Sequence, residues 1–212
     1  MKEFTPAHIK ICGVTLEEQA QLVSDLGFGA IGFVLYEKSP RYVSPKKIAE
    51  LTSKISPFIK KVAVVVNVTV DEIRNLWLTN LFDYFQLHGD ESPEYCTTLQ
   101  NDGIPFIKAF RMKKAAEIPR LNEYPGGFFL TDAYHQNQYG GTGVAFDWDL
   151  LKKFSDEKQI ILSGGITCDN IKQACDIPHI VGFDLSSGVE VSPGIKSPDK
   201  LKYLVQLMSD KP

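Results

Sequence analysis

The stretch HIKICGVTLEEQAQLVSDLGFGAIGFVLY, residues 8–36, contains the unit from which the rest of the chain is built. An apolar run reaches the thiol of Cys12, and apolar residues then recur at helical spacing between 16 and 26. Glycines at 27 and 29 end that segment, and a second apolar run covers 30–36. This change of period predicts a strand, a helix and a second strand. We expect Thr15 to cap the helix.

The same alternation recurs along the whole chain. Further strands are predicted at 62–67, 82–89, 105–111, 126–133, 159–165 and 179–189, and further helices at 44–55, 70–78, 93–101, 113–121, near 148, at 169–175 and at 197–208. Eight strand–helix units predict a closed (β/α)8 barrel, the TIM barrel, as a single domain over residues 1–212. An open doubly wound sheet is the alternative, but no G-x-G-x-x-G follows the first strand.

Composition excludes several classes of protein. The formal net charge is −3 with no basic stripe, which argues against a nucleic-acid partner. No apolar run approaches the roughly 18 residues of a membrane span, and the N-terminal residues lack the apolar core of a signal peptide. The four cysteines form no C-x-x-C pair and have no histidine at metal-ligand spacing. We therefore expect a cytoplasmic protein with reduced thiols and no metal site.

Polar residues gather where the predicted strands end. In a barrel of this kind the chemistry lies at the carboxyl ends of the strands and in the loops after them. An unpaired buried polar group costs about 1–3 kcal/mol, so a fold gains nothing from collecting them at one end. The sequence therefore predicts an active site there, from Lys10, Cys12, Lys38, Arg41, Asn67, Gln86, His88, Lys108, Arg111, Asp132 and Asp184.

Three glycine clusters follow the last three predicted strands. Glycines at these positions let backbone N–H groups converge on an anion. Barrels frequently bind phosphate in the loops after strands seven and eight. We predict a phosphate site from Gly141 and Gly143, Gly164 and Gly165, and Ser187 and Gly188.

In order and spacing, these motifs resemble the phosphoribosylanthranilate isomerase family of tryptophan biosynthesis. The resemblance covers nearly the whole length and rests on KICG (10–13), GFVLYEKSPRYVSP (32–45), VVVN (64–67), QLHGDE (86–91), LTDA (130–133), YGGTGVAFDW (139–148), LSGGI (162–166) and DLSSGVEVSPGIK (184–196). It implies an Amadori rearrangement of N-(5-phosphoribosyl)anthranilate, a small-molecule substrate, without a cofactor or metal. It maps the general base onto Cys12 and the general acid onto Asp132, and Arg41 is similar to the arginine that meets the anthranilate part.

Roles are also predicted for residues around Cys12, Asp132 and Arg41. Lys10, two residues before Cys12 on a strand, shares its face, so Lys10, Arg41 and Lys108 are expected to favour the Cys12 thiolate. Asp184 is expected to pair with Lys10 at the neighbouring strand. Asp184, Lys10 and His88 are assigned to the substrate site, although His88 has no visible partner in the sequence. The aminobenzoate slot is expected between aromatic and aliphatic side chains, namely Phe33, Leu35, Tyr36 and Phe110.

Two other functions compete with this interpretation. Related phosphosugar isomerases on the same scaffold typically carry an aspartate at the position of Cys12 and two similar phosphate sites, whereas glycine clusters occur here only in the C-terminal half. A binding module without activity would lack the acid or the base, and both are present. The sequence leaves open whether the chain is a monomer or a homodimer.

Overall fold

The computed structural model describes residues 3–112, 123–133 and 159–209. The helices predicted at 113–121 and near 148 lie outside the described residues, as do Gly141 and Gly143 of the predicted phosphate site.

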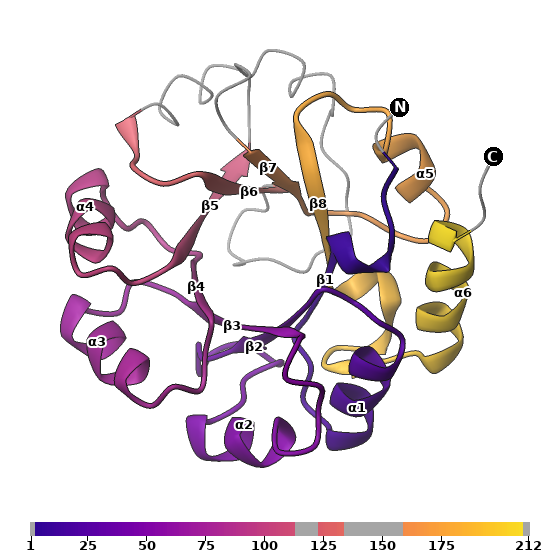
Figure 1. Ribbon diagram of the computed structural model, residues 1–212, viewed down its shortest axis with the longest axis horizontal. Coiled ribbons are helices and arrows are strands. Elements are labelled where there is room, and N and C mark those ends of the chain that lie inside the picture. The colour runs from indigo at the N-terminus through magenta and orange to yellow at the C-terminus, as the bar shows by residue number, and fades with distance from the viewer. Residues whose placement is uncertain (1–2, 113–122, 134–158, 210–212) are drawn as a thin grey trace.

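Eight parallel strands close into a barrel in chain order, which confirms the predicted fold (Figure 1). Continuous apolar runs form them because each strand is covered on both faces. The strands are β1 (Ile9–Cys12), β2 (Ala30–Val34), β3 (Lys60–Val65), β4 (Tyr84–Leu87), β5 (Phe106–Met112), β6 (Phe128–Ala133), β7 (Gln159–Leu162) and β8 (Ile180–Leu185).

The described helices surround the ring of strands (Figure 1). They are α1 (Glu17–Asp25), α2 (Pro45–Leu51), α3 (Val70–Leu78), α4 (Pro93–Asn101), α5 (Ile171–Ala174) and α6 (Pro198–Ser209), with a 3₁₀ turn at Pro6–His8. The predicted start of α2 is confirmed, since the Ser44 side chain accepts from the backbone N–H of Lys47 at 3.3 Å. Among the helices of the described residues, none is long and apolar enough to cross a membrane.

The predicted cap of α1 was wrong. Leu16 occupies the N-cap position and its side chain makes no capping hydrogen bond. The Thr15 hydroxyl instead donates to the backbone carbonyl of Gly194 at 2.7 Å. A contact with a distant loop has therefore replaced the local cap. Gly27 does end the helix, at φ +75°.

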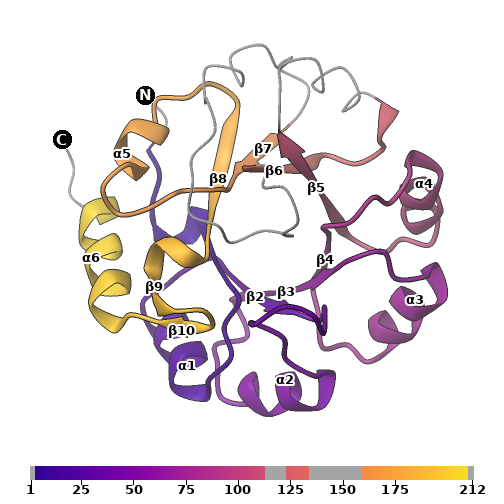
Figure 2. The same ribbon diagram turned by 180° about the vertical axis from the view of Figure 1, so that it is seen from behind.

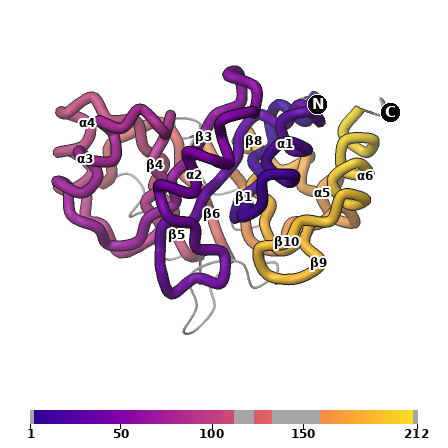
Figure 3. The backbone as a smooth tube through the Cα atoms, turned by 90° about the horizontal axis from the view of Figure 1, so that it is seen from below, coloured from indigo at the N-terminus to yellow at the C-terminus, as the bar shows by residue number. Residues whose placement is uncertain are grey.

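The region after β8 also differs from the prediction. A strand was expected as far as residue 189, but β8 ends at Leu185 and a 3₁₀ turn, Ser187–Val189, follows it. The chain then forms an antiparallel hairpin of β9 (Glu190–Ser192) and β10 (Ile195–Lys196) before α6. Figure 2 shows this hairpin beside α1 and α6, and Figure 3 shows it at the end of the barrel opposite the N-terminus.

Strand alternation divides the side chains between two layers. Ile9 and Ile11 pack in the main apolar core together with residues of the helices, such as Ala20 and Leu204. Cys12 belongs to a separate cluster with Val34 and Val64 inside the barrel. The position of a residue in this two-residue period thus decides whether it can reach the interior.

Candidate active site

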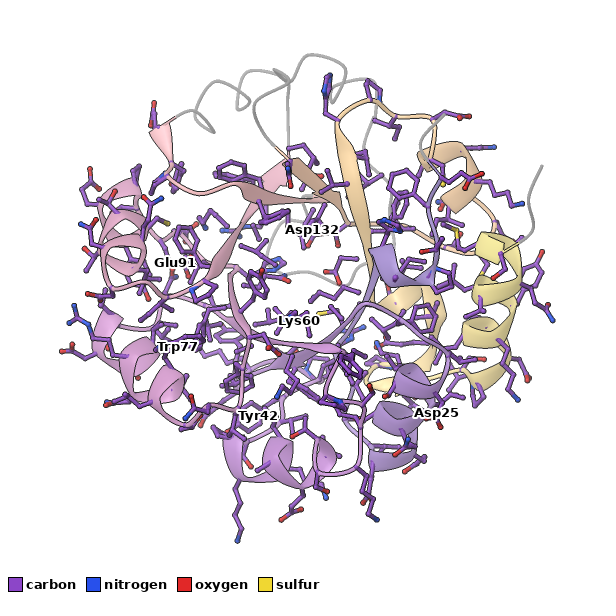
Figure 4. All side chains as sticks on the ribbon, in the orientation of Figure 1. Asp25, Tyr42, Lys60, Trp77, Glu91 and Asp132 are labelled. Atoms are coloured by element: carbon purple, nitrogen blue, oxygen red, sulfur yellow. The ribbon has the colours of Figure 1, made fainter. Side chains whose placement is uncertain are left out.

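A pocket opens at the carboxyl ends of the strands, where the sequence predicts the active site. Asp132 points toward the middle of the ring of strands in Figure 4. The pocket brings together six of the eleven polar residues predicted there, namely Cys12, Arg41, Gln86, His88, Asp132 and Asp184, and its wall is completed by Val34, Tyr36, Ser39, Val64, Val66, Ser163 and Ser186.

Lys10 and Asp184 form a buried ion pair beside Cys12. The two residues are register partners on β1 and β8, and Lys10 Nζ lies 2.8 Å from Asp184 Oδ1, which confirms the predicted pairing. A Cβ atom on Gly32 would lie 2.9 Å from Lys10 Nζ and 3.0 Å from Cys12 Sγ. The missing side chain on β2 therefore makes room for both groups. Lys10 itself is not among the residues that line the pocket.

Burial and charge act in opposite directions on the Cys12 thiol. Burial raises its pKa, Lys10 lowers it, Asp184 raises it further, and Lys196 lowers it. The net direction is upward, so burial outweighs the nearby cations and the pKa of the Cys12 thiol lies above its ordinary value. The pKa of Lys10 is raised although burial alone would lower it, because Asp184 and Cys12 favour its charged form.

One of the cations expected near Cys12 lies elsewhere. Lys108 is on the face of β5 that points away from the barrel interior, and its Nζ is 2.8 Å from Glu91 Oε2. It also donates to the Gly89 carbonyl at 2.8 Å. Figure 4 places Glu91 outside the ring of strands. The expectation for Lys108 was wrong because its position in the two-residue period is opposite to that of Ala109, which packs with interior residues.

Substituting Lys10 by methionine should raise the pKa of the Cys12 thiol further, because a cation that stabilises the thiolate is removed. The measurement is the pH dependence of Cys12 alkylation by iodoacetamide, followed by mass spectrometry of the Cys12 peptide. The double variant Lys10→Met/Asp184→Asn should show a smaller shift, since Asp184 acts in the opposite direction. An unchanged alkylation profile in Lys10→Met would contradict this role of the ammonium group.

Asp132 has a partner that the sequence did not reveal. His88 Nε2 lies 3.2 Å from Asp132 Oδ2, and Gln86 Nε2 lies 2.8 Å from His88 Nδ1. When the Gln86 amide donates to Nδ1, the ring carries its proton on Nε2 and donates it to Asp132. His88 therefore orients the carboxyl group within the pocket, and among the described residues no donor contacts the second oxygen of Asp132.

Arg41 lies in the loop after β2, which a bridge between Val34 and Tyr42 holds against the strand. Its Nε and Nη2 atoms donate to the two carboxylate oxygens of Glu190, at 2.9 and 2.7 Å. Sequence reasoning missed Glu190, although it falls within the DLSSGVEVSPGIK motif. The Ser-Pro-Gly turn signal at 192–194 could have indicated a hairpin that returns this carboxylate to the pocket.

The prediction of the aromatic slot is wrong for three of its four residues. Phe33, Leu35 and Phe110 pack in the layer between the strands and the helices. Tyr36 is the member of that set that lines the pocket, beside the valines of β2 and the β3 segment. Phe33 misses the interior because its neighbours Gly32 and Val34 occupy the inward positions of β2.

The described glycines of the predicted phosphate site lie on neighbouring strand ends, because β7 pairs with β8. Ser163, directly before Gly164, and Ser186, two residues before Gly188, line the pocket. A Cβ on Gly188 would lie 2.0 Å from the Ile166 carbonyl oxygen, so the two loops are in direct contact. Gly164 and Gly165 adopt φ +79° and +73°, a region that favours glycine.

A closed barrel with a thiol, a carboxyl group and an arginine around one pocket at its carboxyl end defines a TIM-barrel enzyme. Among residues 3–112, 123–133 and 159–209, no group of three or more histidine, cysteine or acidic side chains could hold a metal ion.

Comparison with known proteins identifies the family. The family model described as N-(5'phosphoribosyl)anthranilate (PRA) isomerase matches residues 9–207. The isomerase of Citrifermentans bemidjiense is 39% identical over 197 residues, which are 93% of this chain and 94% of the relative. The solved isomerase of Thermus thermophilus has a TM-score of 0.86 at 32% identity, covering 95% of this chain and 98% of that one.

A second solved isomerase is in complex with reduced 1-(o-carboxyphenylamino)-1-deoxyribulose 5-phosphate. Its TM-score is 0.82 at 33% identity, and the match covers 95% of this chain and 97% of that one. The chain belongs to the family of N-(5'-phosphoribosyl)anthranilate isomerases, enzymes of tryptophan biosynthesis.

Proposed function

We propose that this isomerase converts N-(5-phosphoribosyl)anthranilate into 1-(2-carboxyphenylamino)-1-deoxyribulose 5-phosphate by an Amadori rearrangement, with Asp132 as general acid and Cys12 as general base. The observation that carries the proposal is that these two side chains come from β6 and β1 and line the same pocket. A substrate between them can receive a proton from one and lose a proton to the other.

The first step opens the furanose ring. The lone pair of the anthranilate nitrogen forms a double bond to C1′ while the bond from C1′ to the ring oxygen breaks. Asp132 gives its proton to that oxygen, which would otherwise leave as an alkoxide. His88, 3.2 Å from Asp132 Oδ2, keeps the carboxyl group oriented for this transfer.

The second step removes a proton from C2′. The Cys12 thiolate takes the proton, the C–H electrons form a double bond between C1′ and C2′, and the C1′–N electrons return to nitrogen. The resulting enol amine then becomes the aminoketose. Because only the thiolate is a base, Lys10 supports this step by favouring that form against the effect of burial.

Binding of the substrate engages both of its ends. Arg41 receives the anthranilate carboxylate, because a guanidinium group can bind a carboxylate through two hydrogen bonds. The phosphate lies in the loops after β7 and β8, on backbone N–H groups around Gly164, Gly165, Ser187 and Gly188. Asp184 borders the same pocket and holds Lys10 beside Cys12.

Loss of the substrate's fluorescence on addition of the protein tests the proposal directly. Turnover to the aminoketose phosphate is the expected result. Tight binding of the reduced product analogue without turnover would instead favour a phosphosugar-binding module.

The oligomeric state and location are separate proposals. A similar solved structure, at 31% identity and a TM-score of 0.82, contains monomers generated from the dimeric isomerase of Thermotoga maritima. By analogy we propose a homodimer for this chain, which light scattering at several concentrations would test, a monomer throughout being the contrary result. We also propose a cytoplasmic location, since Cys12, Cys96, Cys168 and Cys175 are free thiols.

A further inference from the structure

A cluster of three charged side chains, two of them buried, joins two segments of the chain beside the pocket. Arg41 comes from the loop after β2, and Glu190 and Lys196 come from the hairpin β9–β10. The side chains of Glu190 and Lys196 are 4% and 0% exposed. Buried charges of this kind are destabilising unless each one is paired, so the pairing within the cluster decides what it does.

Both carboxylate oxygens of Glu190 accept hydrogen bonds from groups of the protein. Its Oε1 atom accepts from Arg41 Nε at 2.9 Å, from Lys196 Nζ at 2.7 Å and from the Gly194 amide at 3.2 Å. Its Oε2 atom accepts from Arg41 Nη2 at 2.7 Å. Glu190 and Lys196 are also not among the residues that line the pocket. Any effect of Glu190 on the reaction must therefore pass through another residue.

Arg41 is the residue through which it can act. Glu190 takes one edge of the guanidinium group, formed by Nε and Nη2. The edge formed by Nη1 and the second N–H of Nη2 is not used by this ion pair and can donate two hydrogen bonds to a carboxylate. On the opposite side, a Cβ on Gly13 would lie 2.5 Å from Arg41 Cδ, so the arginine stem packs directly against the backbone at the end of β1. Gly13 also adopts φ +74°, which a residue with a side chain rarely adopts.

The cluster also reaches the backbone of the proposed base. Lys196 Nζ donates to the backbone carbonyl of Cys12 as well as to Glu190. Arg41 and Lys196 together carry two positive charges against the single negative charge of Glu190. One positive charge therefore remains at this edge of the pocket, which suits an anionic group of a ligand.

We propose that Glu190 is a positioning residue: it holds the guanidinium group of Arg41 in the orientation that binds the carboxylate of the anthranilate part. Lys196 completes the unit by attaching it to the strand that carries Cys12. The inference rests on the role of Arg41 proposed above and adds the residue that makes this role possible.

The test is the affinity of the Glu190→Gln variant for the reduced product analogue, measured by calorimetry. We expect a 10- to 100-fold loss, with KM rising more than kcat falls, because the misplaced arginine mainly affects binding. Inhibition by inorganic phosphate should be unchanged, since phosphate does not need Arg41. The matched control is Glu17→Gln, which removes an exposed 2.8 Å ion pair with Lys54 and should leave all values unchanged.

A double-mutant cycle with Arg41→Gln separates the positioning role of Glu190 from the binding role of Arg41. If Glu190 acts through Arg41, the double variant binds the analogue as weakly as Arg41→Gln alone. Additive losses, or weaker inhibition by phosphate in Glu190→Gln, would overturn the positioning role. Normal binding by Arg41→Gln would overturn the role of Arg41 itself, and this inference with it. If Glu190→Gln does not fold, Glu190→Asp, which draws the carboxylate back from the guanidinium group, takes its place with the same expected outcomes.

Discussion

Replacing Cys12 by serine is expected to lower kcat by about 10²- to 10⁴-fold, the usual contribution of a general base. A serine hydroxyl fills nearly the same space but ionises only at far higher pH, so proton removal from C2′ loses its base. Affinity for the reduced product analogue should change little, because that molecule does not undergo the proton transfer. Stopped assays with concentrated enzyme and calorimetry with the analogue measure the two effects.

The pH profile provides a second measurement on the same variant. Because burial raises the pKa of Cys12, kcat/KM of the unmodified enzyme should increase as the pH rises toward that pKa and the thiolate forms. The Cys12→Ser variant should lose this dependence. Cys175→Ser is the matched control, since the Cys175 thiol donates to the Ile171 carbonyl in α5 and does not line the pocket. Near-normal turnover in Cys12→Ser would exclude Cys12 as the base.

Replacing Asp132 by asparagine is expected to lower kcat by a similar factor, about 10²- to 10⁴-fold. The amide keeps the size of the side chain and can still lie beside His88, but it cannot give a proton to the ring oxygen. Ring opening should therefore become rate-limiting. In pre-steady-state experiments the bound substrate should then accumulate before any ring-opened species is formed.

Asp102→Asn provides the comparison for Asp132→Asn. Asp102 pairs with Arg74 at 2.8 Å on the surface, so its loss should leave kcat unchanged. If Asp132→Asn turned over normally, the acid would have to be sought elsewhere in the pocket. Asp184, the other carboxylate that lines it, would then be the first residue to examine.

The regular elements could be predicted where the sequence contains local signals. The bounds of α3 and α4 agree with the prediction because their caps are readable in the sequence: Thr69 with Glu72 for α3, and Ser92 with Pro93 for α4. The pairing of Lys10 with Asp184 followed from the closure of a barrel, which makes the first and last strands neighbours.

Whether a strand side chain points into the barrel or toward the helices could be predicted less well. A strand buried on both faces shows no alternation of polar and apolar residues, so the sequence does not say which alternate set points inward. Lys108 and Phe33 were both assigned to the wrong face for this reason. Cys12 was placed correctly from its position at the end of the first predicted strand and from the resemblance.

Apart from the pair of Lys10 and Asp184, the long-range side-chain partners in the site were not predicted. Arg41 and Glu190 are 149 residues apart in the chain, and the turn signal at 192–194 indicates a hairpin without indicating that Arg41 is its partner. The contact of His88 with Asp132, which are 44 residues apart, was not predicted either. Contacts of this kind depend on how the loops fold back over the barrel.

The hairpin after the eighth strand has a consequence for local unfolding. Its two strands, β9 and β10, form a separate sheet that is not part of the eight-stranded ladder of the barrel. Local opening of this segment would remove the counter-ion of Arg41 and the lysine donor to the Cys12 carbonyl while the ladder stays intact. Activity is therefore expected to be lost under milder conditions than those that unfold the barrel.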